Sequence, residues 1–219
     1  MNKKYLNVKL YFWLLFVLCS IIFVTFPQID ILIASLFYNG ETFFMNGTLI
    51  EEFFYYSVKP LIIILGFSTL LIYTYNRILK KNILNVNTRV VIYIVLALSI
   101  APAFIVNATL KDNWGRARPA QVVNFGGEKE FTPAFVISDQ DGYSFSSGHA
   151  AAAFSLLGFA LLARKNKQLF INITLLYGSL VGLARISAGG HFFSDVVTSF
   201  FIVYIATHIF YKLVFKEEC

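Results

Sequence analysis

Long apolar runs recur along the chain, and they lack the regular polar face of a helix at the surface of a soluble protein. Each run is close to the about 20 residues that an α-helix needs to cross about 30 Å of hydrocarbon. The runs are Leu10–Phe26, Pro60–Asn76, Val90–Leu110, Gly142–Ala163, Gln168–Ala184 and Val196–Tyr211. This pattern predicts an all-α fold, a six-transmembrane-helix bundle that forms a single integral-membrane domain over residues 1–219.

The segment between the first two runs, Gln28–Val58, has a different pattern. Its apolar patches are too short to span a membrane, and acidic residues such as Asp30 and Glu51 are mixed with them. Aromatic residues interleaved with acids favour a short helix that lies along the membrane interface. A surface loop is the alternative interpretation.

The composition agrees with a membrane protein. The 219 residues are 58% hydrophobic and only 14% charged, whereas soluble domains are about 25% charged. This composition excludes a disordered chain, a collagen and a nucleic-acid-binding tail. We therefore expect a membrane protein with no nucleic-acid partner.

Lysine and arginine are unevenly distributed among the segments that join the runs. Most of the 18 basic residues lie before the first run, between the second and third, between the fourth and fifth, or after the sixth. They are Lys3, Lys4, Lys9, Arg77, Lys80, Lys81, Arg89, Arg164, Lys165, Lys167, Lys212 and Lys216. Cytoplasmic segments are enriched in lysine and arginine. Both termini are therefore predicted to be cytoplasmic, and the remaining connections to face outward.

Three polar groups stand at ends of the runs on the predicted outer side. They are Lys111 to Pro119 after the third run, Ser146 to His149 early in the fourth, and Arg185 to Asp195 between the fifth and sixth. Pro119 favours extended backbone at Arg118, which predicts the end of the third helix there. Since these ends share one membrane face in the predicted topology, the three groups are expected to meet on the outer side.

Three basic residues of these groups, Lys111, Arg118 and Arg185, need an anion because an unpaired charge beside hydrocarbon is costly. Asp195 alone cannot neutralise all three. Ser147 and Gly148 begin a predicted helix, where backbone N–H groups and the helix dipole favour an anion. Guanidinium groups match phosphate oxygens two at a time. The pattern therefore predicts a phosphate site.

Two histidines can supply the chemistry. His191 lies four residues before Asp195, so the carboxylate can accept one imidazole N–H and leave the other nitrogen to act as nucleophile or base. His149 comes from a different helix and can donate a proton to the leaving oxygen. The third histidine, His208, lies near the cytoplasmic end of the sixth run and is expected to be structural.

We expect no metal and no cofactor. A site for a hard cation needs several carboxylates, whereas Asp195 is the one carboxylate predicted among three cations. The zinc-binding spacing His-Glu-x-x-His is absent from the sequence.

The order and spacing of the three groups carry a resemblance to a known family. The motifs are Lys111-x6-Arg118-Pro119, Ser147-Gly148-His149 and Arg185-x5-His191-x3-Asp195. They resemble the three-part signature of the type-2 phosphatidic acid phosphatase superfamily, which includes membrane lipid phosphatases, glucose 6-phosphatase and soluble vanadium haloperoxidases. The resemblance implies a phosphoric monoester hydrolase.

It also implies a role for each motif residue. His191 would be transiently phosphorylated, Asp195 would support it, and His149 would protonate the leaving group. The residues implied to hold the phosphate are Lys111, Arg118, Ser147, Gly148 and Arg185. The chain departs from the family pattern at two positions, because Ser146 stands where proline is usual and Ala184 where serine is usual.

Further motifs narrow the resemblance. They are Trp114-Gly-Arg-Ala-Arg-Pro, Phe125-Gly126-Gly127, Phe131-Thr132-Pro133 and Ser138-Asp139-Gln140. They resemble the bacterial subgroup that includes lipid A phosphatases, whose 4'-phosphatase members are similar in size. This implies an enzyme of the bacterial inner membrane whose site faces the periplasm and removes a phosphate from lipid A, with the 4'-phosphate favoured. Lipid A carries two phosphates, and we predict that Arg116 and Lys129 hold the second.

Two alternatives stay open. Within the same class, the substrate is undecaprenyl pyrophosphate or phosphatidylglycerophosphate. In another class, the chain is a six-span anion transporter, which would carry its charges near the middle of the membrane. The charges of this chain lie at the ends of the runs, which favours the enzyme.

Overall fold

Helices make up most of the chain in the computed structural model, which describes residues 4–215. Lys3 and Lys216, which contribute to the predicted orientation, lie outside these residues. The elements are β1 (Lys4–Tyr5), β2 (Val8–Lys9), α1 (Leu10–Thr25), α2 (Gln28–Ser35), α3 (Leu49–Leu79), η1 (Ile83–Asn85), α4 (Thr88–Val95), η2 (Leu96–Lys111), α5 (Asp112–Trp114), η3 (Pro119–Gln121), η4 (Val123–Phe125), α6 (Gly148–Ser155), α7 (Leu157–Leu162), α8 (Lys167–Ser187) and α9 (Phe193–Phe215). The predicted helical fold is confirmed, with β1 and β2 as one short antiparallel hairpin.

Several of these helices are long and apolar enough to cross a membrane. Within residues 4–215 four helices meet this test, namely α3, α8, α9 and the continuous helix Thr88–Lys111. The helices α1 and α2 make a fifth span if they are counted together, although they are bent by 85°. The helix Gly148–Leu162 is apolar but shorter. The chain is therefore a multi-pass membrane protein, and the six-span count stays a prediction.

The second span begins earlier than its apolar run indicates. The helix α3 starts at Leu49, eleven residues before Pro60, because Thr48 caps it: the Thr48 hydroxyl accepts a hydrogen bond from the backbone N–H of Glu51 at 3.4 Å. With 31 residues, α3 is about 46 Å long at 1.5 Å per residue. Its first turns therefore extend to the level of the loop that follows α8.

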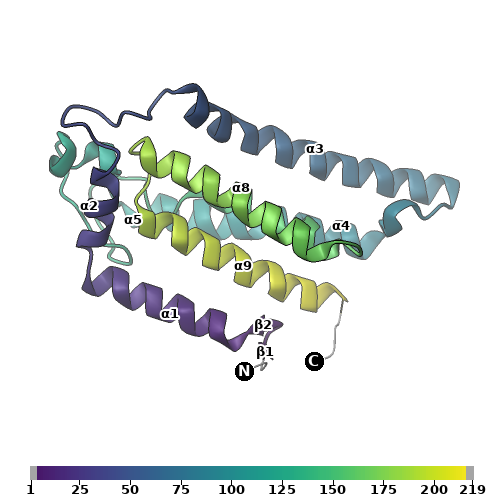
Figure 1. The fold of residues 1–219 in the computed structure, drawn as a ribbon. Coiled ribbons are helices and arrows are strands. Elements are labelled where there is room, and N and C mark those ends of the chain that lie inside the picture. Colours follow the sequence, from purple (N-terminus) through teal and green to yellow (C-terminus); the bar gives the residue numbers. More distant parts are fainter. Residues whose placement is uncertain (1–3, 216–219) are drawn as a thin grey trace.

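A short helix does lie between the first two spans. It is α2, which crosses one end of the bundle at a steep angle to α1 (Figure 1). Asp30 and Ala34 on this helix are buried, so one face of α2 packs onto the protein. Its position at a membrane interface stays a prediction.

The third span changes its winding near the middle. After α4, the helix widens into a π-helix over Leu96–Lys111, which contains Pro102. Proline has no N–H to donate and disturbs the regular helix. The side chain of Asn107 donates to the carbonyl oxygen of Pro102 at 2.9 Å.

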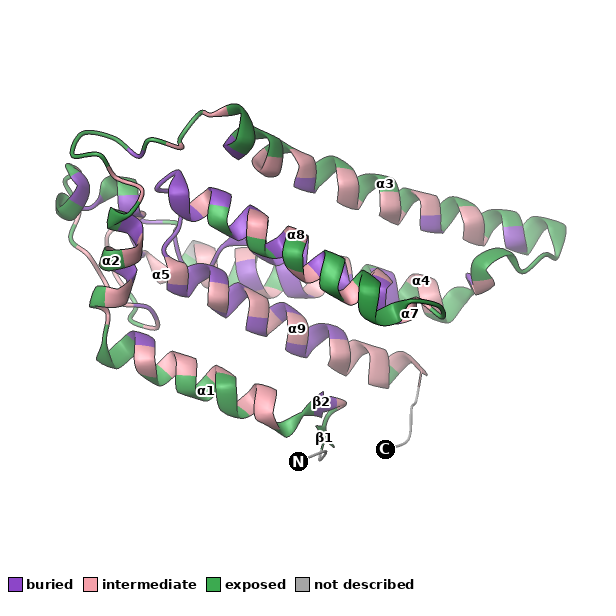
Figure 2. Cartoon of the chain, viewed as in Figure 1, coloured by how far each residue is buried: buried purple, intermediate pink, exposed green. Residues whose placement is uncertain are grey.

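The helix α6 forms the centre of the bundle, where it packs against α8, α9 and η2. Its sequence contains four consecutive alanines, Ala150 to Ala153, and such small side chains let neighbouring helices approach closely. Figure 2 shows that exposed residues are frequent along α1 and α3, whereas the connection between α8 and α9 is buried.

Distant helix ends meet at one end of the bundle. The end of α8, the start of α9, the short helix α5 after η2 and the helix α2 lie there (Figure 1). At the start of α6, the backbone N–H of Ser147 donates to the carbonyl oxygen of Asp195 on α9 at 3.4 Å. That this end faces outward stays a prediction. At the other end, Asn7 next to β2 donates to the backbone oxygen of His208 near the end of α9, at 3.5 Å. The first and last described segments therefore share the end of the bundle opposite to the polar groups.

Candidate active site

His191 lies in the short connection between α8 and α9 and is 2% exposed. Its Nδ1 lies 2.8 Å from the backbone carbonyl oxygen of Ser144. Because a carbonyl oxygen can only accept, Nδ1 carries the proton and Nε2 keeps its lone pair. The Nε2 atom is therefore the one that can react.

Asp195, in the first turn of α9, is fully buried beside this ring. Its Oδ2 lies 3.7 Å from Nδ1 of His191 and accepts hydrogen bonds from the Ser144 hydroxyl at 2.6 Å and the Phe192 N–H at 2.8 Å. The predicted pair of His191 and Asp195 is adjacent, but Ser144 makes the shorter contact to each. Ser144 precedes the second motif, and nothing in the motif spacing identified it.

The charge of His191 follows from these neighbours. Burial lowers the pKa of the His191 imidazole, Asp195 raises it, and the positive charges of Arg185 and Arg118 lower it again. The net pKa lies below the usual value of 6.5, so the ring is neutral at pH 7. A neutral imidazole is the form that can act as a nucleophile.

Arg116 does not hold a second phosphate, and that prediction is wrong. Its side chain is fully buried, and its guanidinium donates to Asp195 and, at 2.8 Å, to Asp30. It also lies 4.4 Å from the ring centroid of Phe192. Burial lowers the pKa of Arg116, but the charges of Asp195 and Asp30 raise it by more, so that the net pKa is above its usual value. Arg116 is thus a permanent buried cation between two carboxylates.

Lys129 also contacts the protein itself. Its ammonium group donates to the backbone carbonyl oxygens of Gln140 and Asp141, at 2.5 Å and 3.2 Å. These bonds join two parts of the long connection between α5 and α6. The structure therefore gives Lys129 a role in holding this connection together.

Arg185, at the end of α8, faces the start of α3. Its Nη1 donates to Oε1 of Glu51 at 2.6 Å, and its guanidinium lies 4.7 Å from the ring centroid of Tyr55. Gly190 passes so close to this guanidinium that a side chain there would collide with it. Sequence reasoning missed Glu51 and Tyr55 because it began the second span too late.

His149 contacts the same Tyr55 ring as Arg185. The predicted start of its helix is confirmed, since Ser147 is the N-cap of α6 and accepts from the backbone N–H of Ala150. The imidazole stacks on Tyr55, with ring centroids 4.2 Å apart and planes inclined by 26°. Tyr55 therefore supports both the His149 imidazole and the Arg185 guanidinium.

Electrostatic interactions link His149 to the other predicted residues. The residues whose charges act on its imidazole are Arg185, His191, Lys111 and Arg118. These residues come from three separate motifs, and such interactions fall off steeply with distance. Arg185 and His149 thus share a contact with Tyr55, and the charges of His191, Lys111 and Arg118 act on the same imidazole.

The route of the chain from Lys111 to Arg118 differs in part from the prediction. The helix ends at Trp114, and Gly115 follows with a left-handed φ of +67°. Arg118 is extended, with φ −82° and ψ 159°, as Pro119 predicts. Lys111 and Arg118 therefore do not share one helix face, but both still act on His149.

No ligand-like cluster for a metal accompanies these residues. Within residues 4–215, no group of three or more His, Cys, Asp or Glu side chains is arranged to hold a metal ion. The arrangement instead combines several cations, a neutral imidazole with a free Nε2, and a second imidazole. Such a site can bind a phosphoryl group, attack it and protonate a leaving oxygen.

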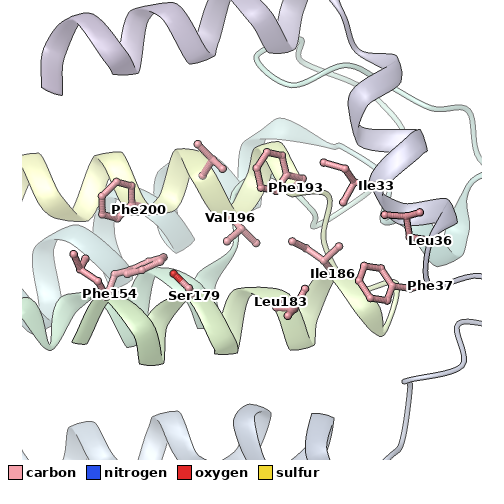
Figure 3. Close-up of a pocket in the computed structure, with 12 residues that line it drawn as sticks. Ile33, Leu36, Phe37, Phe154, Ser179, Leu183, Ile186, Phe193, Val196 and Phe200 are labelled. Carbon is pink, nitrogen blue, oxygen red and sulfur yellow. The ribbon is translucent and has the colours of Figure 1, made fainter. Parts of the chain in front are cut away.

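An apolar cavity of about 570 Å³ lies between α2, α8 and α9 (Figure 3). Its lining includes Ile186 of α8, Phe193 and Val196 of α9, and Phe154 of α6. The cavity can therefore accept apolar groups.

Comparisons with known proteins agree with this geometry. The model of the PAP2 superfamily matches residues 91–219. The lipid A 4'-phosphatase of Francisella tularensis subsp. novicida is 37% identical over 213 residues, which are 90% of this chain and 91% of that protein. The lipid A 4'-phosphatases of Rhizobium leguminosarum and Rhizobium etli are 38% and 36% identical over 103 residues, which are 46% of this chain and 44% and 40% of those proteins. No solved structure gives a significant match. The chain is therefore a phosphatase that belongs to the PAP2 superfamily.

Proposed function

We propose that this protein hydrolyses a phosphomonoester of a membrane lipid, without a metal, through a phosphohistidine at His191. The observation that carries the proposal is the meeting of the two histidines with Lys111, Arg118 and Arg185 at one end of the bundle. Three separate motifs contribute to this meeting. Cations near a transferring phosphoryl group stabilise the charge of its transition state.

In the first step, Nε2 of His191 attacks phosphorus and the bond from phosphorus to the lipid oxygen breaks. His149 gives a proton to that oxygen, which leaves as a hydroxyl. Lys111, Arg118 and Arg185, with the Ser147 hydroxyl and the backbone N–H of Gly148, hold the phosphoryl oxygens. In the second step, water attacks phosphorus, the N–P bond breaks, and inorganic phosphate leaves while His149 takes up the proton of the water.

We propose lipid A as the substrate, with its 4'-phosphate favoured. The relatives named lipid A 4'-phosphatase support this choice, since one of them aligns over nearly the whole chain. The apolar cavity between α2, α8 and α9 supports a lipid, because acyl chains need apolar surface (Figure 3). Arg116 and Lys129 bind groups of the protein itself and are not part of the proposed substrate site.

We further propose that the protein is a single domain of the bacterial inner membrane that crosses it six times. Both termini would be cytoplasmic and the site would face the periplasm, as the distribution of lysine and arginine predicts. The opposite placement of the polar groups and of the two ends of the described chain supports this orientation. An outward site suits a lipid that has reached the outer leaflet.

The first experiment is phosphate release from bis-phosphorylated lipid A by the protein purified in detergent. Mass spectrometry of the product identifies the phosphate that is lost. His191→Ala and His149→Ala should each lose activity by at least about 10³-fold, as expected when a nucleophile or an acid is removed. His208→Ala is the matched control, because His208 binds the Tyr204 carbonyl oxygen with its Nδ1 at 2.8 Å near the far end of α9, and it should keep full activity.

A second experiment tests the covalent intermediate. Substrate that carries ³²P should leave an acid-labile and base-stable label on the wild-type protein after rapid quenching, and none on His191→Ala. Activity without any such label would exclude the phosphohistidine.

The alternatives give different results. If phosphate is released from undecaprenyl pyrophosphate or phosphatidylglycerophosphate but not from lipid A, the proposed substrate is wrong and the proposed catalytic residues still stand. A transporter would move anions into vesicles and release no phosphate with or without His191.

A further inference from the structure

Asp30 lies outside the segment 91–219 that the family model matches, yet it reaches the centre of the site. It is on α2, the helix that crosses the polar end of the bundle (Figure 1). Its side chain is 1% exposed. A carboxylate that is buried so completely needs a strong reason to be there.

Donors surround the two oxygens of Asp30. Nη2 of Arg116 donates to Oδ2 at 2.8 Å, the backbone N–H of Ser194 donates to Oδ1 at 2.9 Å, and the Ser194 hydroxyl donates to Oδ2 at 2.5 Å. Burial raises the pKa of Asp30, Arg116 and Ser194 lower it, and the charge of Asp195 raises it again, so that the net pKa lies above its usual value. An ionised carboxylate, which only accepts, satisfies all three donors at once.

Arg116 connects this carboxylate to the catalytic pair. One of its amino groups binds Asp30 and the other binds Asp195, and Asp195 lies 3.7 Å from the His191 ring. Asp30, Arg116 and Asp195 thus carry two negative charges and one positive charge. Without Asp30, Arg116 would cancel the charge of Asp195.

The proposed reaction needs that remaining negative charge. When Nε2 attacks phosphorus, the imidazole of His191 becomes positive. The groups that act on His191 from other elements are Arg185 on α8, Arg118 before η3 and His149 on α6, and the two arginines disfavour a positive ring. Asp195 on α9 opposes them, and it can do so fully only if Arg116 is neutralised from its other side.

We propose that Asp30 is a positioning residue that acts through Arg116: it neutralises Arg116, so that Asp195 keeps a net negative charge behind His191. This inference rests on the proposed function, since it concerns the nucleophile of that reaction. It assigns to α2 a part in catalysis and explains why a carboxylate on that helix is buried.

The test is a charge cycle at these two positions, with kcat and the acid limb of the pH profile as readouts. Asp30→Asn removes a negative charge near His191, so kcat should fall about tenfold and the acid limb should move to lower pH by up to about one unit. Arg116→Gln removes a positive charge, so its acid limb should move to higher pH. In the double variant Asp30→Asn/Arg116→Gln the two shifts should largely cancel, and kcat should recover relative to Asp30→Asn.

A merely structural role for Asp30 predicts a different result. The folded Asp30→Asn protein would then keep its acid limb, and the double variant would be no better than either single variant. Ser35→Ala is the control on the same helix, because Ser35 is exposed and bonds only locally, to the carbonyl oxygen of Leu32 at 2.8 Å, and it should match the wild type. If Asp30→Asn does not fold, Arg116→Gln and the double variant still decide. The acid limb of Arg116→Gln should lie at higher pH than that of the wild type, and the limb of the double variant should lie below that of Arg116→Gln. No shift in Arg116→Gln, or a double variant whose limb lies above it, overturns the inference.

The wild type separates the two proposals. Wild-type protein that forms no phosphohistidine refutes the proposed function, and the inference falls with it. Wild-type protein that forms phosphohistidine, together with variants whose profiles do not move, refutes the inference about Asp30 alone.

Discussion

Gly190 offers a substitution that tests the role of Arg185 in holding the phosphate. A Cβ atom there would lie 2.8 Å from Cζ and 3.2 Å from Nε of Arg185, and still closer to one of its amino groups. The colliding atoms belong to the end of a flexible side chain, so the Arg185 guanidinium would move and the backbone would stay. In Gly190→Ala, Arg185 therefore leaves the position in which we propose that it holds the phosphate.

The magnitude follows from the contacts that Arg185 makes. A hydrogen bond to a charged group contributes about 1.5–3 kcal/mol, so a lost pair of phosphate contacts should cost about 3 kcal/mol, or roughly 10²-fold in kcat/KM. The ion pair with Glu51 is largely buried, so its loss should destabilise the fold by about 3–5 kcal/mol. In a protein of this size that corresponds to a Tm lower by about 6–20 °C.

The assay is phosphate release from lipid A in detergent, with a thermal unfolding curve of each variant. The matched control is Gly66→Ala on α3, where a Cβ would meet only Cδ1 of Leu98 at an ordinary 3.7 Å, and full activity is expected. Gly190→Ala with wild-type kcat/KM would refute the proposed role of Arg185. A fall in Tm well beyond about 20 °C would instead refute the argument that only a side chain moves.

Three further predictions concern the nucleophile and its surroundings. Ser144→Ala removes the hydroxyl that donates to Asp195 at 2.6 Å but keeps the carbonyl that binds His191, so kcat should fall about tenfold with KM unchanged; steady-state kinetics with an unchanged kcat would contradict this. Because the pKa of His191 lies below 6.5, the neutral nucleophile persists as pH falls through 6.5, and a profile of kcat/KM with its acid limb above that value would contradict the assignment. Activity should survive dialysis against EDTA, and a loss that zinc or magnesium restores would contradict a metal-independent mechanism.

Local sequence signals predicted the local parts of the site. Pro119 forces extended backbone at Arg118, and Ser147 caps the helix that carries His149, and both features are present. These effects act between neighbouring residues, so the sequence states them directly. The meeting of the motifs followed from topology alone, because alternate helix ends must share one side of the bundle.

Contacts between distant segments could not be predicted in this way. Arg116 looked like an outer cation, but Asp30, 86 positions away in the chain, pairs with it. Glu51 and Tyr55 were missed for a different reason, because the predicted span began at Pro60. The sequence from Thr48 to Glu51 has the form of a helix capping box, and this signal would have moved the start of α3 to its observed position.

The first ninety residues do more than anchor the protein. Glu51 and Tyr55 of α3 contact Arg185 and His149, and Asp30 of α2 pairs with Arg116. The segment shared with the superfamily thus lacks part of the wall around its own reactive groups. A fragment restricted to that segment would leave Arg185 without Glu51, His149 without Tyr55 and Arg116 without Asp30. We therefore expect the smallest active unit to include α2 and α3.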